Sequence, residues 1–173
     1  MKLALPQFRR VVRDTVLVAL DLLIINPRGE VLVGKRRNPP AEGYLFVPGG
    51  RILKGEGLAD ALNRISTAEI GVALKKQDAI LHGIYDHIYP DNAFGEVGLN
   101  THYIVIACLF RLGDFVPRVH DNQHEEMRML QIGELLNNHQ VHPYTRNYFV
   151  SDPSNLFLRA NELHRNDFLT QGV

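Results

Sequence analysis

The pattern of apolar and polar positions predicts a β-hairpin near the start of the chain. Val16 to Ile25 is an almost uninterrupted apolar run that ends at the turn residues Asn26-Pro27-Arg28-Gly29. Such a run is typical of a strand that is buried on both faces. Glu30 to Lys35 follows the turn, so we expect a hairpin with a buried first arm. Leu45 to Val47 predicts a short further strand.

A helix is predicted shortly after the sequence Pro48-Gly49-Gly50. Its apolar stripe has the spacing of a helix lying on a core and consists of Leu58, Ala61, Leu62 and Ile65. Gly71 stands where such a helix should end. Pro48-Gly49-Gly50 itself predicts a turn, because glycine allows positive φ angles and the close approach of a ligand.

The second half of the chain predicts two long strands followed by short helices. Ala79 to Tyr89 and Asn100 to Leu112 read as the strands, and Met127 to Gln131 as another. Helices are expected near Pro6, over Ile132 to Asn138, over Pro143 to Val150 and after Asp152-Pro153. This order predicts an α+β fold with a mixed β-sheet between helices. The tail from about Asn166 is expected to be loose.

Composition narrows the class of protein. The 173 residues are 45% hydrophobic, which suits a single domain, 1–173, with one core. Lys plus Arg balance Asp plus Glu at 19 each, and this neutral charge argues against nucleic acid or a membrane surface as the main partner. The lone Cys108 lies in an apolar run and favours the reducing cytoplasm. No stretch reads as a signal peptide or a membrane span.

Several charged residues surround the predicted turn. Asp21 interrupts the first apolar run, so it needs either a ligand or a neighbouring donor, and the two readings are equally good. Arg36 and Arg51 could bring guanidinium groups to phosphate oxygens, although a solvated charge is an equal alternative for Arg36. Glu56 and Arg64 are expected to pair with each other and to fix the loop on the helix.

Helix geometry places Ile65, Ala68 and Glu69 on roughly the same side of the helix. Only Glu69 carries a carboxylate. One carboxylate can anchor about one Mg²⁺, whose other ligands come from carbonyl groups, water and phosphates.

The histidines allow more than one interpretation. His87 lies on a predicted long strand with Tyr103 on the other, and His82, His87 and His102 could all be outward polar positions, which is the better reading for His82. The segment DFVPRVHDNQHEE contains Gln123 and His124 in a predicted loop. By spacing alone that segment could supply metal ligands, a catalytic base or a solvated turn.

The spacing of the residues Gly50, Glu56, Arg64, Glu69 and Gly71 resembles the signature of the Nudix hydrolases, in which a loop, a helix and a second loop hold a divalent metal against a diphosphate. The family pattern has further carboxylates at the positions of Ile65 and Ala68. Within the family, the stretches GKRRNPPAEGYLFVPGGR, TAEIG, YDHIYPDN, THYIVI and DNQHEE are most similar to the GDP-mannose mannosyl hydrolases, with a likeness that extends to about Val150.

The resemblance implies a Nudix-type α/β/α sandwich, a homodimer, and a set of site residues. One Mg²⁺ per subunit, replaceable by Mn²⁺, would be held with both substrate phosphates by the Gly49 carbonyl, Glu69 and Gln123. His124 would be the general base. The departing diphosphate would be stabilised by Arg36, Arg51 and Tyr103. Asp21 would bind on the sugar side, and His87 matches a histidine of the family motif whose role is open.

The implied reaction is hydrolysis of GDP-mannose, and of GDP-glucose, by water attacking the anomeric carbon with inversion. A nucleoside diphosphate neutralised by Mg²⁺ and arginine is a good leaving group, so one base suffices and no general acid is needed. Ordinary glycosidases need two carboxyl groups. The alternatives are a pyrophosphohydrolase, which attacks phosphorus and releases a nucleoside monophosphate and a sugar phosphate, and a nucleotide-sugar-binding domain without turnover.

Overall fold

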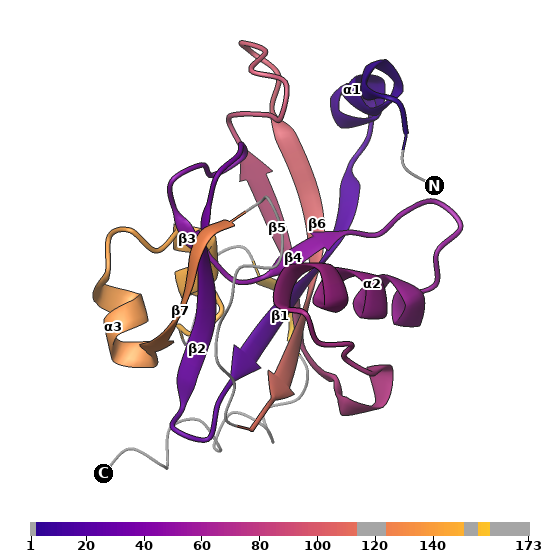
Figure 1. Cartoon of the computed structure of the whole chain (residues 1–173). Helices are drawn as coiled ribbons and strands as arrows, with labels where there is room; N and C mark the ends of the chain where they lie inside the picture. Colours follow the sequence, from indigo (N-terminus) through magenta and orange to yellow (C-terminus); the bar gives the residue numbers. More distant parts are fainter. Residues whose placement is uncertain (1–2, 114–123, 151–155, 160–173) are drawn as a thin grey trace.

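A mixed β-sheet forms the centre of the molecule (Figure 1). The computed structural model describes residues 3–113, 124–150 and the backbone of 156–159. The strands are β1 Leu17–Ile25, β2 Glu30–Arg36, β3 Leu45–Phe46, β4 Gly49–Arg51, β5 Ile80–Tyr89, β6 Thr101–Arg111, β7 His124–Gln131 and β8 Leu156–Arg159. The helices are α1 Leu5–Asp14, α2 Leu58–Ile70, α3 Ile132–Asn137 and α4 Pro143–Asn147, with a 3-10 turn, η1, at Lys76–Asp78.

The strand order is β3-β2-β1-β6-β5-β8, with β4 added to β1 and β7 added to β2. β1 and β6 run parallel over the full length of β1, from Leu17 opposite Tyr103 to Ile25 opposite Arg111. The other pairs among the described strands are antiparallel. The predicted mixed sheet is therefore confirmed.

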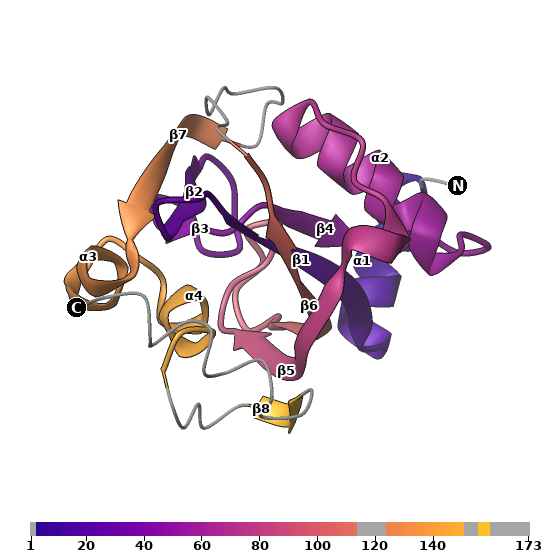
Figure 2. The ribbon, with the colours of Figure 1, turned by 90° about the horizontal axis from the view of Figure 1, so that it is seen from below.

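Helices cover both faces of this sheet, as Figure 2 shows with α2 on one side and α3 and α4 on the other. The alternation of side chains along β1 explains the two layers. One set packs with α2 and consists of Leu20, Leu22 and Ile24. The opposite set packs toward α3 and α4 and consists of Ala19, Leu23 and Ile25. A strand buried on both faces accounts for the almost uninterrupted apolar run in the sequence.

The predicted hairpin opens beyond its turn. β1 and β2 pair at Ile25 and Val31, and farther along, the same edge of β1 pairs with β4 from Ala19 to Asp21. The prediction of a turn at Pro48-Gly49-Gly50 is wrong, because Gly49 and Gly50 belong to β4 and neither has a positive φ. Position 49 nevertheless requires a glycine, because β1 lies too close for a side chain. A Cβ at this position would clash with Asp21 Oδ1 and lie 2.8 Å from the Leu20 carbonyl oxygen.

Most other predicted elements are confirmed, including α2, which ends at Gly71 with a φ of 70°. Two predictions are wrong. His124 begins β7 and does not lie in a loop. The helix expected after Asp152-Pro153 is replaced over Leu156–Arg159 by β8, which pairs with β5, while residues 151–155 and the tail from about Asn166 lie outside the described residues. Within the described part of the chain, no helix is long and apolar enough to cross a membrane.

Candidate active site

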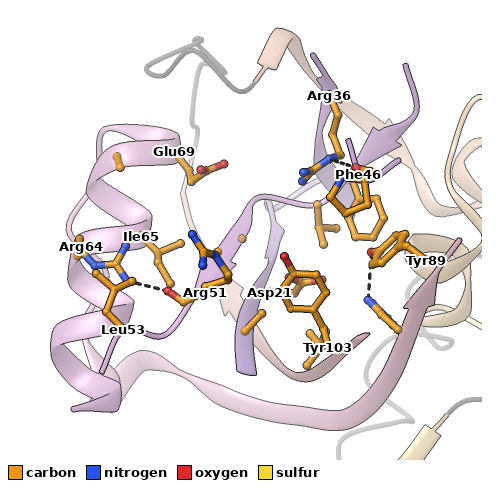
Figure 3. A pocket seen from close by; sticks show the side chains of 18 residues that line it. Asp21, Arg36, Phe46, Arg51, Leu53, Arg64, Ile65, Glu69, Tyr89 and Tyr103 are labelled. Carbon is orange, nitrogen blue, oxygen red and sulfur yellow. Dashed lines mark hydrogen bonds between the residues drawn. The ribbon is translucent and has the colours of Figure 1, made fainter. Parts of the chain in front are cut away.

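A cavity of about 490 Å³ lies where β4 and β2 separate along β1, and the carboxyl-terminal half of α2 forms one of its walls. Its volume is in the range of small-molecule sites. Figure 3 shows Glu69 on the α2 side, Arg51 and Asp21 in the middle, and Tyr103 and Arg36 across from α2. The predicted site residues that line it are Asp21, Arg36, Gly49, Arg51, Glu69, His87 and Tyr103. Gln123 lies outside the described residues.

The loop before α2 is fixed to the helix by a half-buried ion pair, as expected from the sequence. Arg64 Nε and Nη2 donate to the Glu56 carboxylate at 2.6 and 2.8 Å. Arg64 Nη2 also donates to the Arg51 carbonyl oxygen at 2.8 Å. The hydrogen bonds from Arg64 lower the pKa of Glu56 to about 2, so this carboxylate stays ionised. Arg64 therefore joins α2 both to the preceding loop and to β4.

Helix α2 presents one carboxylate to the cavity. Ile65, Ala68 and Glu69 all line it, which confirms that they share a side of the helix. Ile65 is only 2% exposed and packs in the core beneath Gly50, whereas Ala68 is exposed. Glu69 is 3% exposed. Of the two positions at which the resemblance implies further carboxylates, Ile65 is therefore part of the core and Ala68 is exposed.

The backbone pattern directs the Gly49 carbonyl toward the same region. Ile52 N donates to Val18 O, and Leu22 N donates to Pro48 O. These bonds leave Gly49 and Arg51 at positions whose carbonyl groups point away from β1. The Arg51 carbonyl accepts from Arg64 of α2, so the Gly49 carbonyl, two residues away, lies on the edge of β4 that faces α2.

These oxygens fit a magnesium site with few protein ligands. The described residues contain no group of three or more His, Cys, Asp or Glu that could hold a metal ion. Glu69 and the Gly49 carbonyl both face the cavity and offer the hard oxygen ligands that Mg²⁺ prefers. Mg²⁺ takes its remaining ligands from water and phosphates, so this donor set suits one ion.

His124 lies beside Glu69. It is opposite Arg36 in the β2–β7 ladder, and its Nδ1 is 3.4 Å from Glu69 Oε2. The two side chains are 2% and 4% exposed, and His124 does not line the cavity. Its ring lies against Gly34, where a Cβ would come within 2.9 Å of His124 Cγ. Sequence reasoning missed Gly34, because only the strand pairing reveals this requirement.

Two arginines form a cationic wall. Arg36 is half-buried, donates from Nε to the Pro40 carbonyl oxygen at 2.9 Å and lies 6.0 Å from the centre of the Phe46 ring. Arg51 is half-buried too, with its guanidinium 3.7 Å from the centre of the Phe8 ring of α1. Both line the cavity, and for Arg36 the roles of phosphate ligand and of solvated charge at the cavity mouth both stay predictions. Burial raises the pKa of Tyr103, which stays a neutral donor between them.

Asp21 has both a protein partner and a place on the cavity wall. The carboxylate is 7% exposed and accepts a hydrogen bond of 2.6 Å from the Tyr148 hydroxyl. Burial raises the pKa of Asp21 to about 6, while the Tyr148 bond and the charge of Arg36 oppose that rise. The two readings of Asp21 left open by the sequence are thus compatible.

His87 is buried, so the outward reading is wrong for it. Its ring stacks on Tyr144 with 4.1 Å between the ring centres, and its Nε2 lies 3.3 Å from the Tyr148 hydroxyl oxygen. Burial, assisted by the nearby His142, lowers the pKa of His87 to about 3, and the ring is neutral. The outward reading is wrong for His82 as well, because this half-buried ring places Nε2 2.8 Å from the Tyr148 carbonyl oxygen.

The buried His87 predicts a specific loss of stability in acid. Because its folded pKa is below the unfolded value, its contribution is complete above about pH 6.5 and is lost as the pH falls toward 3. At pH 5 the free energy of unfolding should be lower by roughly 2 kcal/mol because of this histidine. Urea unfolding at pH 7 and pH 5 measures the change. In His87→Gln the decrease between the two pH values should be smaller than in the wild type by about that amount. The exposed His139→Gln is the control, and equal losses in all three proteins would contradict the assignment.

Comparison with known proteins agrees with this architecture. The NUDIX domain family model matches residues 16–150. The low-salt glycan biosynthesis protein Agl8 of Haloferax volcanii is 33% identical over 142 residues, which cover 82% of this chain and 85% of that protein. The crystal structure of the MutT NUDIX hydrolase from Burkholderia pseudomallei superposes with a TM-score of 0.63 at 26% identity and covers 78% of this chain and 96% of that chain.

A more distant structure shows the same fold. The NUDIX domain of Shewanella oneidensis NrtR, solved with ADP ribose, has a TM-score of 0.61 at 12% identity and covers 85% of this chain and 97% of that chain. The family model spans most of the chain and includes the cavity, α2 and both arginines. This protein belongs to the Nudix family.

Proposed function

We propose that the protein is a Mg²⁺-dependent hydrolase that converts GDP-mannose, and also GDP-glucose, to GDP and free sugar by attack of water on the anomeric carbon. The observation that carries this proposal is the single carboxylate, Glu69, on the α2 wall of the cavity. Attack on phosphorus is assisted by several metal ions, for which the described residues offer no ligand cluster. Attack on carbon needs the metal only at the leaving diphosphate.

The cationic wall suits a diphosphate leaving group. Arg36 and Arg51 can make bidentate hydrogen bonds to phosphate oxygens, and Tyr103 can donate a further one. Their charge opposes the negative charge that grows as the bond between carbon and oxygen breaks. A Mg²⁺ held by Glu69, the Gly49 carbonyl and Gln123 would supply additional neutralisation of both phosphates when bound. Mn²⁺ should substitute for it.

The proposed base is His124, and the proposed sugar contacts are Asp21 and His87. His124 Nδ1 lies 3.4 Å from Glu69 Oε2, next to the proposed metal ligand, and an imidazole is the side chain that takes up a proton near neutral pH. Asp21 lines the middle of the cavity, as Figure 3 shows, and its carboxylate could accept a hydrogen bond from a sugar hydroxyl. His87 lines the wall behind it.

Guanine, mannose and the homodimer enter this proposal from the resemblance to the GDP-mannose mannosyl hydrolases. The cytoplasmic location rests on the lone Cys108, and the single domain over 1–173 rests on length and composition. The name of the Haloferax relative, a glycan biosynthesis protein, supports a sugar-containing substrate.

Hydrolysis in ¹⁸O-labelled water tests this function directly. GDP-mannose and Mg²⁺ should give labelled mannose and unlabelled GDP, because water attacks carbon. The first mannose detected by NMR should be the β-anomer, since direct displacement on an α-linked substrate inverts the configuration.

Two other outcomes would overturn the proposal. GMP and mannose phosphate, one of them carrying the label, would establish attack on phosphorus. Binding of GDP-mannose without any product, in the presence of Mg²⁺ or Mn²⁺, would favour a nucleotide-sugar-binding domain.

A further inference from the structure

Tyr148 contacts Asp21 of the cavity wall and does not belong to the family signature between Gly50 and Gly71. It follows α4 directly, is 2% exposed, and its hydroxyl donates to Asp21 Oδ2 at 2.6 Å. Asp21 Oδ1 lies on the side of Gly49, because a Cβ on Gly49 would clash with that atom. The Tyr148 hydroxyl therefore fixes one carboxylate oxygen and sets the direction of the other along the cavity.

The position of the Tyr148 ring is itself determined by several contacts with β5. The ring packs edge to face on Tyr85, with 4.7 Å between the ring centres. The backbone carbonyl oxygen of Tyr148 lies 2.8 Å from His82 Nε2. One helical turn earlier, the Tyr144 hydroxyl accepts from Ile88 N at 2.9 Å and donates to Ile88 O at 2.7 Å. A side chain held at both its ring and its backbone is a rigid support for a binding group.

The hydrogen bonds run in one direction toward Asp21. The Tyr148 hydroxyl has one proton, which is donated to the carboxylate. His87 Nε2, 3.3 Å from the same oxygen, must then be the donor, and its Nδ1 is the acceptor that faces the Tyr89 hydroxyl at 3.5 Å. This order fixes the tautomer of His87, in agreement with a neutral ring. The predicted site residues His87 and Asp21 thus belong to one network, joined by Tyr148.

We propose that Tyr148 is a positioning residue for sugar recognition, because its hydroxyl orients the Asp21 carboxylate and is itself oriented by His87. This inference rests on the proposed function, in which Asp21 accepts from the sugar of a nucleoside diphosphate sugar. Tyr148 does not line the cavity and acts through Asp21. Its loss should weaken recognition of the sugar and leave recognition of the diphosphate, on the wall of Arg36 and Arg51, unchanged.

The test compares GDP-mannose with GDP. Tyr148→Phe should lower kcat/KM for GDP-mannose about 10-fold to 100-fold, the range for a lost hydrogen bond to a charged group. The inhibition constant of GDP should stay within about 2-fold of the wild-type value, because GDP lacks the sugar. In a double-mutant cycle, adding Tyr148→Phe to Asp21→Asn should have little further effect, since the hydroxyl acts through that carboxylate.

Tyr144→Phe is the matched control, because it removes an identical hydroxyl from α4 whose bonds go to the backbone of Ile88. It should destabilise the attachment of α4 to β5. It should not lower kcat/KM for GDP-mannose relative to the affinity for GDP. If Tyr148→Phe does not fold, His87→Gln, which removes the ring that holds the Tyr148 oxygen, replaces it. Because His87 is also a proposed sugar contact, the network is supported only if adding His87→Gln to Asp21→Asn has little further effect, and additive losses would overturn it.

The inference and the proposed function can fail separately. Unchanged kcat/KM in Tyr148→Phe, or equal losses for GDP-mannose and GDP, would overturn the positioning role while wild-type protein still releases labelled mannose. Label found on phosphate with the wild-type protein would overturn the proposed function, whatever the variants do.

Discussion

Replacing His124 by Gln should lower kcat for GDP-mannose hydrolysis by about 10² to 10⁴, the range expected when a general base is lost. Gln keeps a similar size and a hydrogen-bonding group beside Glu69, so the packing around β7 should survive. The rate is measured as GDP release at saturating Mg²⁺ and substrate. An unchanged kcat would remove His124 from the mechanism.

The burial of His124 against Glu69 calls for a second measurement. A lost base should leave the Mg²⁺ concentration for half-maximal rate unchanged. A large shift in that concentration would mean instead that His124 acts by holding Glu69 in place. His139→Gln, on an exposed turn, is the control and should match the wild type. Gly34→Ala offers an independent route, because the added Cβ must displace the His124 ring and should also slow turnover.

Replacing Glu69 by Gln should raise the half-saturating Mg²⁺ concentration by about 10-fold to 100-fold or more. Loss of groups that merely orient a metal ligand already reduces metal affinity by about that factor, so loss of a direct ligand should have at least this effect. The amide retains the volume of the carboxylate but removes the charge that attracts the ion. A Mg²⁺ titration of GDP release, with Mn²⁺ in parallel, measures the change.

The control for Glu69 is Glu134→Gln, which removes an exposed carboxylate from α3 and should leave the titration unchanged. A normal metal titration in Glu69→Gln would mean that the metal ligand has been misplaced. Ala68→Glu is a further probe, because Ala68 lines the cavity and is exposed. A second carboxylate there should not raise the rate, since carbon attack needs no additional metal ion. Ile65→Glu is unsuitable, because it would bury a charge in the core.

The sequence determined most elements of the fold because their signals are local. The apolar run from Val16 to Ile25 became β1, buried on both faces, and helical spacing with a terminal glycine gave α2. The pairing of Glu56 with Arg64 also followed from the chain, because both residues belong to one loop and the helix that continues it. Residue type and position along these elements, together with the resemblance to the Nudix hydrolases, were enough to name seven described residues that line the cavity.

Only the tertiary structure decided how these elements form a site. It placed Gly49 in a strand beside Asp21, where sequence reasoning expected a turn, because strand pairing overrides the local preference of glycine. It buried His124, which the sequence placed in a loop, by pairing β7 with β2. It also joined Tyr148 to Asp21, 127 positions apart in the chain. Periodicity and capping act within one element and can be read locally, whereas contacts between distant segments depend on how whole strands and helices pack.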